Sequence, residues 1–380
     1  MLFRRNKKAK SDWAVGLDFG TSQVRGVLFQ RVSTTLKLKS TDAQALAATN
    51  SNNSAYTAFK YKLEAFDVRP FPFTSGKSEN ISAAAAVVAE LFSALSAPDS
   101  CAFAVINPIG TVVCQVELPR MPLPEARAAL QLNSARFLHR DLSNYYIDLT
   151  EQTLVGTPTP APKNNKMQLL VGAATRPDVL WYRNVLFAAK VRPLAIELST
   201  LTVVNGLLTT EPELCQKEAI LLLDLGARTT SMNFLWRGQL AFTHVMYFGS
   251  QQITEHLAQK LGLDLAAAEA EKIKMSEAVQ RLVQAAISPL ARELRSSIDF
   301  FDQQHDCRIN RTLACGGVAG SPKILEILGL EVGIRIEVWN CLDRFDTTAT
   351  RGDQAQLAVV APELAAAVGV ALARLSEWRA

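Results

Sequence analysis

The sequence is poor in the residues that usually mark a disulfide framework, a metal centre or a membrane span. It has six cysteines and four histidines, with no Cys-x-x-Cys pair and no metal-ligand spacing between them. Such cysteines fit a reducing compartment with free thiols. No run of about 18 uncharged apolar residues occurs, and no Gly-x-Ser-x-Gly motif predicts a hydrolase nucleophile. With 48% hydrophobic and 20% charged residues, the composition is that of a globular chain.

Outside the N-terminal segment, the sequence has almost no excess of positive over negative charge. The formal net charge is +4, from 40 basic and 36 acidic residues. Five of the basic residues lie among the first ten positions, which hold no acid, so the remainder is close to neutral. The sequence therefore predicts no nucleic-acid partner. Residues 1–11 are expected to form a flexible basic tip, with contact to anionic lipid as the alternative.

The first half of the chain changes pattern at its centre. Short strands are expected at residues 15–17 and 24–29, and an Ala-rich helix at 82–95. Residues 119–197 predict the order helix, strand, strand, helix, strand, which is a small α+β insert. A Pro-rich polar loop at 156–166 interrupts that insert.

Helical periodicity dominates the second half. Helices are expected at 252–261 and 265–275, followed by a long helix that runs to about residue 303. Pro289 lies inside this long pattern, so we expect it to kink the helix or to mark its true start. A last helix is expected at 365–378.

Two distant segments share one plan, and this repeat is the most informative feature of the sequence. Residues 15–24 (VGLDFGTSQV) and 222–231 (LLDLGARTTS) each hold an apolar strand ending in Asp, a Gly two residues on, and small hydroxyl residues. A glycine turn exposes backbone N–H groups as a concave anion site, to which the hydroxyls add donors. The Asp can hold Mg²⁺ or its waters beside the phosphates. Two facing copies would clamp a polyphosphate.

The order of the segments favours a shared site over unrelated hairpins. A single copy of the plan is a common strand–turn sequence. Here two copies about 200 residues apart are followed, about 90 residues later, by ACGGVAGS at 314–321. The two adjacent glycines of that third segment would let the backbone lie flat against an adenine ring. The alternative for the third segment is a plain strand-to-helix turn.

Other motifs are incomplete. Residues 75–78 (SGKS) resemble the end of a P-loop, but Phe71 stands where its first Gly is required. Residues 315–320 miss the dinucleotide-binding fingerprint by its first Gly. The histidines are expected to be surface or core residues and not ligands: His139, His244, His256 and His305.

The order of the three segments resembles the phosphate-1, phosphate-2 and adenosine signature of the actin/Hsp70/sugar-kinase superfamily. Within it, nearly the whole chain resembles the type IV pilus assembly PilM family, which is related to the cell-division protein FtsA. The resemblance rests on VGLDFGTSQVRGVLF, VVCQVELPRMP, LLLDLGARTTSMNF, GSQQITEHLAQKLGLDLAAAEAEKIK, LARELRSSIDFF, ACGGVAGS and AAAVGVALA. It implies an α/β actin-like ATPase fold, with two lobes around a nucleotide cleft and an inserted, SHS2-like α+β subdomain, 1C.

The resemblance also implies a division of the chain. In order, the expected parts are the basic tip (1–11), subdomain 1A (12–118), the inserted subdomain 1C (119–197), a return to 1A (198–218), subdomain 2A (219–248), subdomain 2B (249–310), 2A again (311–362) and a closing helix to 1A (363–380).

By resemblance, the site would bind ATP and Mg²⁺. The magnesium residues would be Asp18 and Asp224. Phosphate would be contacted by Gly20, Thr21, Ser22, Gly226, Thr229 and Thr230. Glu271 and Lys272 would lie near the ribose and base, although Lys272 by itself is typical of a solvated helix charge. The adenosine would face Gly316, Gly317 and Ser321.

Three positions depart from the family pattern. Arg25 stands where relatives usually have Lys, which keeps the charge but changes reach and geometry. Phe248 and Gly249 replace the usual Gly-Gly pair, and Arg25 and Gly249 are still expected among the nucleotide-binding residues. Ser199 stands where we expect the acid that orients the attacking water, and a Ser is no general base at neutral pH without help. We therefore expect slow or absent ATP hydrolysis.

The resemblance implies a scaffold at the cytoplasmic face of the inner membrane. Its partner would be the short cytoplasmic N-terminal peptide of a PilN-like bitopic membrane protein, and self-association is possible. An active ATPase or sugar-kinase relative is an alternative, but we identify no catalytic Asp and no sugar pocket. An FtsA-like filament or membrane anchor is another; the sequence stops at Ala380 without the usual terminal amphipathic helix. A GspL-like domain is disfavoured by the intact hairpins and the missing transmembrane segment.

Overall fold

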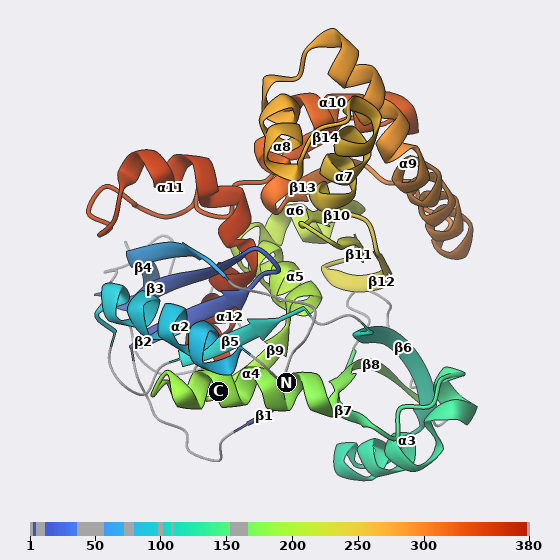
Figure 1. The fold of residues 1–380 in the computed structure, drawn as a ribbon. Helices are drawn as coiled ribbons and strands as arrows, with labels where there is room; N and C mark the ends of the chain where they lie inside the picture. The colour runs from blue at the N-terminus through green and yellow to red at the C-terminus, as the bar shows by residue number, and fades with distance from the viewer. Residues whose placement is uncertain are drawn as a thin grey trace, which may run out of the picture.

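A computed structural model describes residues 3–4, 12–35, 57–71, 80–97, 102–107, 110–152 and 166–377. It has two lobes, each built on one mixed β-sheet, and a smaller third sheet beside them (Figure 1). Most of the expected basic tip, the Pro-rich loop up to residue 165, the SGKS segment and Trp378 lie outside the described residues.

The first lobe is a six-stranded sheet in the order β1-β9-β5-β2-β3-β4. Its central strand is apolar and buried from Ala14 onward, as expected for a strand with neighbours on both sides. The hairpin partner β3 runs antiparallel to β2, whereas β5 and β9 run parallel to it and to each other. The elements are β1 (Phe3–Arg4), β2 (Trp13–Phe19), β3 (Gln23–Thr35), β4 (Thr57–Pro70), α2 (Ile81–Leu95), β5 (Ala102–Ile106) and β9 (Ala195–Leu198).

The strand β1 changes the expectation for the N-terminal tip. Its two residues pair antiparallel with Ala195 and Ile196 of β9. This part of the expected flexible tip is therefore a sheet edge, because an open edge strand offers backbone groups to any neighbouring extended segment.

The second lobe repeats the plan of the first in the sheet order β12-β11-β10-β13-β14. Again an antiparallel hairpin is followed by a parallel strand: Asp18 lies opposite Val105, and Asp224 opposite Cys315. The long helix begins at Glu277, so the expectation that Pro289 marks its start was wrong. The elements are β10 (Ile220–Leu225), β11 (Thr230–Trp236), β12 (Gln239–Met246), α7 (Ser250–Leu261), α8 (Leu265–Lys274), α9 (Glu277–His305), β13 (Arg311–Cys315), α10 (Pro322–Val332) and β14 (Ile336–Val338).

The third sheet, in the order β6-β8-β7, belongs to the insert. The expected order of elements is present, but the pairing differs at both ends. The strand β6 pairs with β8, although it was expected in subdomain 1A, whereas β9 lies inside the first-lobe sheet. All four residues of β9 are buried, which suits the interior of a sheet, and β6 is only half-buried. The elements are β6 (Val112–Pro119), α3 (Leu123–Leu138), β7 (Tyr145–Glu151), β8 (Lys166–Thr175) and α4 (Arg176–Ala188).

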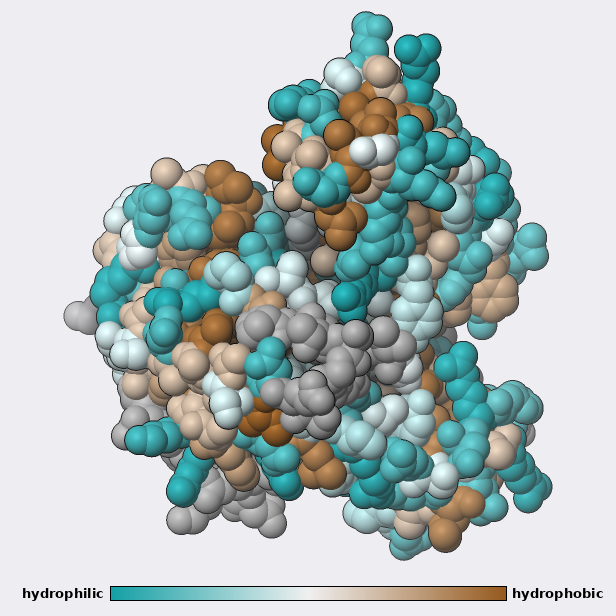
Figure 2. All heavy atoms as spheres, viewed as in Figure 1, coloured by the Kyte–Doolittle hydropathy of each residue, from teal (hydrophilic) through white to brown (hydrophobic). Residues whose placement is uncertain are grey.

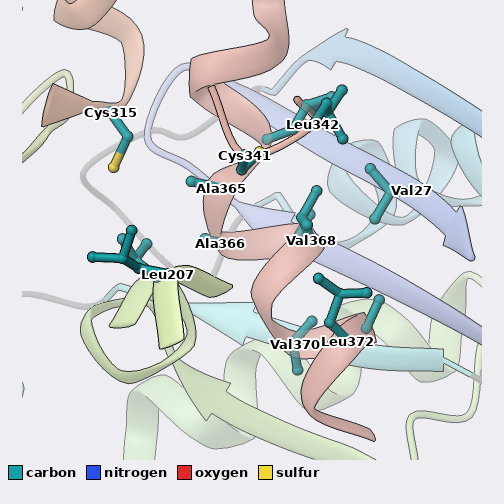
Figure 3. Packing of buried hydrophobic residues seen from close by; sticks show 14 of the residues in the cluster. Val27, Leu207, Cys315, Cys341, Leu342, Ala365, Ala366, Val368, Val370 and Leu372 are labelled. Carbon is teal, nitrogen blue, oxygen red and sulfur yellow. The ribbon is translucent and has the colours of Figure 1, made fainter. Parts of the chain in front are cut away.

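Two helices connect the lobes at the centre of the molecule, α5 (Ser199–Thr210) and α12 (Ala365–Glu377). Figure 3 shows Val368, Val370 and Leu372 of α12 in a core that Leu207 of α5 joins. The stretch Gln354–Ser376 is long and apolar enough to cross a membrane, but 72% of its most apolar window is buried inside the fold. Such burial is typical of a core helix.

The segment before α12 crosses back to the first lobe. The chain passes from α6 (Pro212–Lys217) through the second-lobe sheet and then reaches α11 (Gln354–Val360). The one-turn helix η2 (Ala361–Leu364) follows and leads into α12. The amide of Arg351 donates to Glu64 O at 2.9 Å, and the hydroxyl of Thr350 donates to Leu63 O at 2.8 Å. These contacts differ from the expected assignment of 311–362 to subdomain 2A. We propose that the part around Arg351 belongs to the first lobe.

Candidate functional site

The two Asp–Gly hairpins line one cavity of about 340 Å³ between the lobes. Asp18 comes from β2 of the first lobe and Asp224 from β10 of the second, and both side chains face this cavity. Figure 2 shows a notch between the part of the surface that carries α11 and the part that carries α10. The volume lies at the small end of the range for ligand pockets.

The first hairpin brings its turn and one cation to the cavity. Gly20, Thr21 and Ser22 form the turn after β2, and all three line the wall. Arg25, opposite Asp18 in the hairpin register, donates from Nη1 to Asp18 Oδ2 at 3.3 Å. A methyl group on Gly20 would stand 2.7 Å from this guanidinium, so glycine is what allows Arg25 to lie over the turn.

The second hairpin is tied together by its own backbone. Gly226 N donates to Thr229 O at 2.9 Å, which closes the turn between β10 and β11. Gly226, Arg228 and Thr229 line the cavity. The amides of Ser250 and Gln251, at the start of α7, donate to the carbonyls of this turn and fix it against the helix.

The carboxyl groups of the cavity lie close enough to affect one another's pKa. The pKa of Asp18 is raised to about 6, chiefly by burial; Arg25 lowers it, and the carboxylates of Asp224 and Glu363 contribute to the rise. Burial also raises the pKa of Asp224. Arg25 donates from Nη2 to Glu363 Oε2 at 2.5 Å, so one guanidinium serves both Asp18 and Glu363. The cavity thus holds three carboxylates around one buried cation, an arrangement that favours an added cation.

The third segment approaches the second hairpin closely at Gly316. Its φ is +86°, and a methyl group here would stand 2.7 Å from both Asp224 Oδ1 and Leu225 O. Only glycine meets both conditions. Gly317 lines the cavity beside it, and Gly316 N donates to Pro362 O at 2.9 Å.

The residue at the expected catalytic position also lines the cavity. Ser199 is buried at the start of α5, and its hydroxyl lies 3.5 Å from Asp224 Oδ2. The nearest acid in the sequence, Glu197, forms a buried ion pair with Arg374 of α12. Glu197 is not among the residues that line the cavity.

Five expected site residues lie outside the cavity lining. Thr230 is fully buried and donates to Phe248 O at 2.8 Å, which argues against a phosphate contact by this hydroxyl. A methyl group on Gly249 would stand 2.5 Å from the carbonyl carbon of Ala227, so this glycine allows α7 to pack behind the second turn. The remaining three are Glu271, Lys272 and Ser321.

Lys272 is a buried residue and not a solvated helix charge. Its ammonium group donates to Thr254 Oγ1 at 2.8 Å and to Glu269 Oε2 at 2.7 Å, and lies 3.4 Å from Ser250 O. Ser250 lines the cavity, so Lys272 supports that wall from behind. Glu271 instead pairs with Lys274.

Several residues that line the cavity were missed by sequence reasoning, and Asn107, Tyr182 and Glu363 are among them. Asn107 lies in a connection between two predicted strands, and its pairing with a residue of the other lobe has no local signal. Tyr182 comes from α4 and packs edge-on against Phe19, with ring centroids 5.3 Å apart. The acid of Pro-Glu at the start of the last helical pattern was the one available signal for Glu363.

The fold and the site define a class. Two similar lobes that each bring an Asp–Gly hairpin to a shared cavity form the actin-like ATPase fold, as expected from the sequence. The sequence model of the family described as type IV pilus assembly protein PilM matches residues 147–375, more than half of the chain. The chain therefore belongs to this family, and the resemblance seen in the sequence is confirmed.

Solved structures share the fold over almost the whole chain. The chain is similar to the structure described as the PilM–PilN type IV pilus biogenesis complex, with a TM-score of 0.75, 22% identity, and 95% of this chain and 98% of that chain covered. It is also similar to the ethanolamine utilization protein EutJ from Carboxydothermus hydrogenoformans, with a TM-score of 0.52, 13% identity, and 96% and 91% covered. No curated protein sequence matches the chain.

Proposed function

We propose that this protein is an ATP-binding scaffold of the type IV pilus assembly machinery. The observation that carries the proposal is that Asp18 and Asp224, from equivalent hairpins of two lobes, line one cavity. The turn amides beside each Asp and the hydroxyls of Thr21, Ser22 and Thr229 supply donors for phosphate oxygens. Gly316 and Gly317 line the same cavity, and we place the adenosine against them.

The donor set fits magnesium held by the nucleotide. Magnesium commonly keeps several waters and takes one or two carboxylates together with substrate phosphates. Among the described residues, no group of three His, Cys, Asp or Glu side chains is placed to hold a metal alone. Asp18 and Asp224 would therefore hold Mg²⁺ or its waters together with the phosphates. When bound, the metal neutralises phosphate charge beside the carboxylates.

Slow hydrolysis follows from the residues next to Asp224. Ser199 has no acidic proton acceptor of its own apart from that Asp, at 3.5 Å. Glu197 is committed to Arg374 and lies outside the cavity lining. A water beside the terminal phosphate would thus lack a dedicated general base. We expect phosphate release below about 1 s⁻¹, and a faster rate would contradict the scaffold assignment.

The partner we propose is a short cytoplasmic peptide of a bitopic inner-membrane protein of the PilN type. The support is family membership and the likeness to a structure described as a PilM–PilN complex. In this proposal the protein lies in the cytoplasm and reaches the inner membrane through that peptide. The residues of the basic tip are a second route to the membrane, through anionic lipid.

The nucleotide part of the proposal is tested by ligand-induced stability. ATP with Mg²⁺ at 100 times its dissociation constant should raise the free energy of unfolding by about 2.7 kcal/mol. Asp18→Asn or Asp224→Asn should remove most of this increase. Asp299→Asn is the matched control, because Asp299 is exposed on α9. An undiminished increase in both cavity variants would contradict the proposed site.

The partner part is tested separately. The N-terminal cytoplasmic peptide of an inner-membrane pilus protein encoded beside this chain is immobilised, with a scrambled peptide of the same composition as control. We expect capture of the purified protein by the first peptide alone. Equal capture by both, or by neither, would favour an ATPase or kinase relative over a peptide-binding scaffold.

A further inference from the structure

One hydrogen bond crosses the cavity from lobe to lobe. Asn107 follows β5 in the first lobe, and Thr229 belongs to the turn before β11 in the second. Asn107 Nδ2 donates to Thr229 Oγ1 at 3.0 Å, and both residues line the cavity. No motif of the sequence joins these residues, which are 122 positions apart.

The direction of this hydrogen bond determines what the hydroxyl group can do. A threonine hydroxyl has one proton to donate and two lone pairs to accept with. Asn107 occupies a lone pair, so the hydroxyl proton is left to donate elsewhere. The backbone of Thr229 is fixed by the bond from Gly226 N to Thr229 O. What Asn107 controls is therefore the orientation of the side-chain hydroxyl.

The neighbouring threonine shows the contrast. Thr230 donates its proton to Phe248 O and is fully buried. Of these two adjacent threonines, Thr229 lines the cavity, whereas the hydroxyl of Thr230 is used in a hydrogen bond inside the fold.

We propose that Asn107 is a positioning residue of the phosphate site, acting through Thr229. It turns the Thr229 hydroxyl so that its proton is donated to a phosphate oxygen of the bound nucleotide. Because the two residues belong to different lobes, the contact exists only when the lobes are close, and a phosphate that accepts from Thr229 favours that arrangement. This inference rests on the proposed nucleotide site.

A second contact holds the Asn107 segment against the second lobe. Gly110 N donates to Tyr247 Oη at 2.8 Å, where Tyr247 directly follows β12. Asn107 and Gly110 thus both meet the second lobe at the same end of the β11–β12 pair, because Thr230, next to Thr229, lies opposite Met246, next to Tyr247. The segment is placed to respond to the position of that lobe.

The test compares ligands with and without phosphate. Dissociation constants for ATP, ADP and adenosine are measured by calorimetry on the full chain with Mg²⁺. Asn107→Ala should weaken ATP binding about fivefold, the equivalent of one hydrogen bond, while adenosine binding changes less than about twofold. Asn107→Asp should weaken ATP binding more, because a carboxylate only accepts and would take the hydroxyl proton. Equal losses for ATP and adenosine would overturn the inference.

A double-mutant cycle separates positioning from a purely structural role. Thr229→Val removes the hydroxyl with little change of shape, and in that background Asn107→Ala should have no further effect on ATP binding. Additive losses would mean that Asn107 does not act through Thr229. Thr243→Val is the matched control, since Thr243 makes a comparable bond to Asn233 Oδ1 at 2.9 Å within one lobe. It should leave ATP binding unchanged.

Measurements on the wild-type protein separate a failure of the proposed nucleotide site from a failure of the role of Asn107. If it binds ATP no better than adenosine, the proposed function fails. If it prefers ATP and Asn107→Ala keeps that preference, only the role of Asn107 fails. Circular dichroism and thermal unfolding of each variant show whether it folds, and a folded Asn107→Asp variant with wild-type ATP affinity would also overturn the inference.

Discussion

Arg25 is the residue on which the charge balance of the cavity depends. Its side chain is 12% exposed and contacts Asp18 at 3.3 Å and Glu363 at 2.5 Å. Asp224 adds a third negative charge that favours the charged guanidinium. The guanidinium donates from Nε and Nη2 to Glu363 and from Nη1 to Asp18, whereas a lysine would have to reach both acids from one ammonium nitrogen. The arginine therefore links the first hairpin to the residues before α12.

Removing Arg25 should destabilise the nucleotide-free protein. Arg25→Ala leaves the buried Asp18 and the half-buried Glu363 without a counter-ion, and we expect a loss of about 2–4 kcal/mol in the free energy of unfolding. Urea denaturation without nucleotide measures it. Adding Glu363→Gln should restore part of the loss, because one of the unpaired charges is then absent.

The matched control is Arg31→Ala on the same strand. Arg31 pairs with Asp12, whose side chain is 62% exposed, so its ion pair is screened by water. We expect a loss below about 1 kcal/mol. Equal losses for the two arginine variants would mean that the cavity charges are solvated and that Arg25 has no special part in their balance.

At this scale the sequence predicts what is local and misses what is not. Asp18 and Asp224 were predictable, because strand, Asp, Gly and hydroxyl residues follow one another within ten positions. Asn107 and Glu363 reach the cavity from segments far away in the chain; no local pattern marks Asn107, and the only signal for Glu363 was its place after Pro362 at the start of the last helix. Lys272 was misjudged without the family because its burial depends on α7, which packs beside it.

Among the helices and strands, the close crossing of α5 and α12 depends on glycine, which has no side chain. A methyl group on Gly369 would stand 1.8 Å from Thr202 O of the facing helix. On the other side of α12, a methyl group on Gly16 of β2 would stand 2.0 Å from Ala367 O. The helix is thus packed backbone to backbone against α5 and against the central strand. Periodicity predicted the helix itself, but its two close neighbours are known only from the fold.

Gly369→Ala should therefore separate the two central helices. The clash involves a backbone carbonyl and cannot be relieved by a rotamer change, so we expect a loss of at least about 2 kcal/mol on thermal or urea unfolding. Gly320→Ala is the control, because nothing lies within 4 Å of its added methyl group. That variant should stay within about 0.5 kcal/mol of the parent. A tolerated Gly369→Ala would contradict the close packing.

The insert shows why element boundaries were harder to predict than elements. The order of helices and strands in residues 119–197 was right, yet the pairing put β6 into the insert and β9 into the first lobe. Strand pairing is non-local and depends on which faces are buried. The half-buried pattern of β6 and the full burial of β9 are the physical reason, and we propose that the insert extends from β6 to α4.

At the scale of the whole molecule, the insert is attached to the second lobe as well as to the first. Gln115 of β6 and Gln152, after β7, both donate from Nε2 to Leu240 O of β12, at 2.8 and 3.1 Å. The two glutamines also contact each other at 2.7 Å. On its other side the insert continues into α4, whose Tyr182 lines the cavity. The insert is thus joined both to the second lobe and, through α4, to the wall of the cavity.

Removing both amides should loosen the insert from the second lobe without unfolding either. Each hydrogen bond contributes about 0.5–1.5 kcal/mol, so in Gln115→Ala/Gln152→Ala the amides of β6 and those around Leu240 should exchange hydrogen on the order of tenfold faster. Amides of β13, which lies between β10 and β14 in the second sheet, should be unchanged. Gln168→Ala is the control, since Gln168 is exposed in the insert sheet and exchange should stay at the parental rate. Faster exchange in β13 would mean that the second lobe itself depends on the insert, and unchanged exchange in β6 would mean that the two parts move independently.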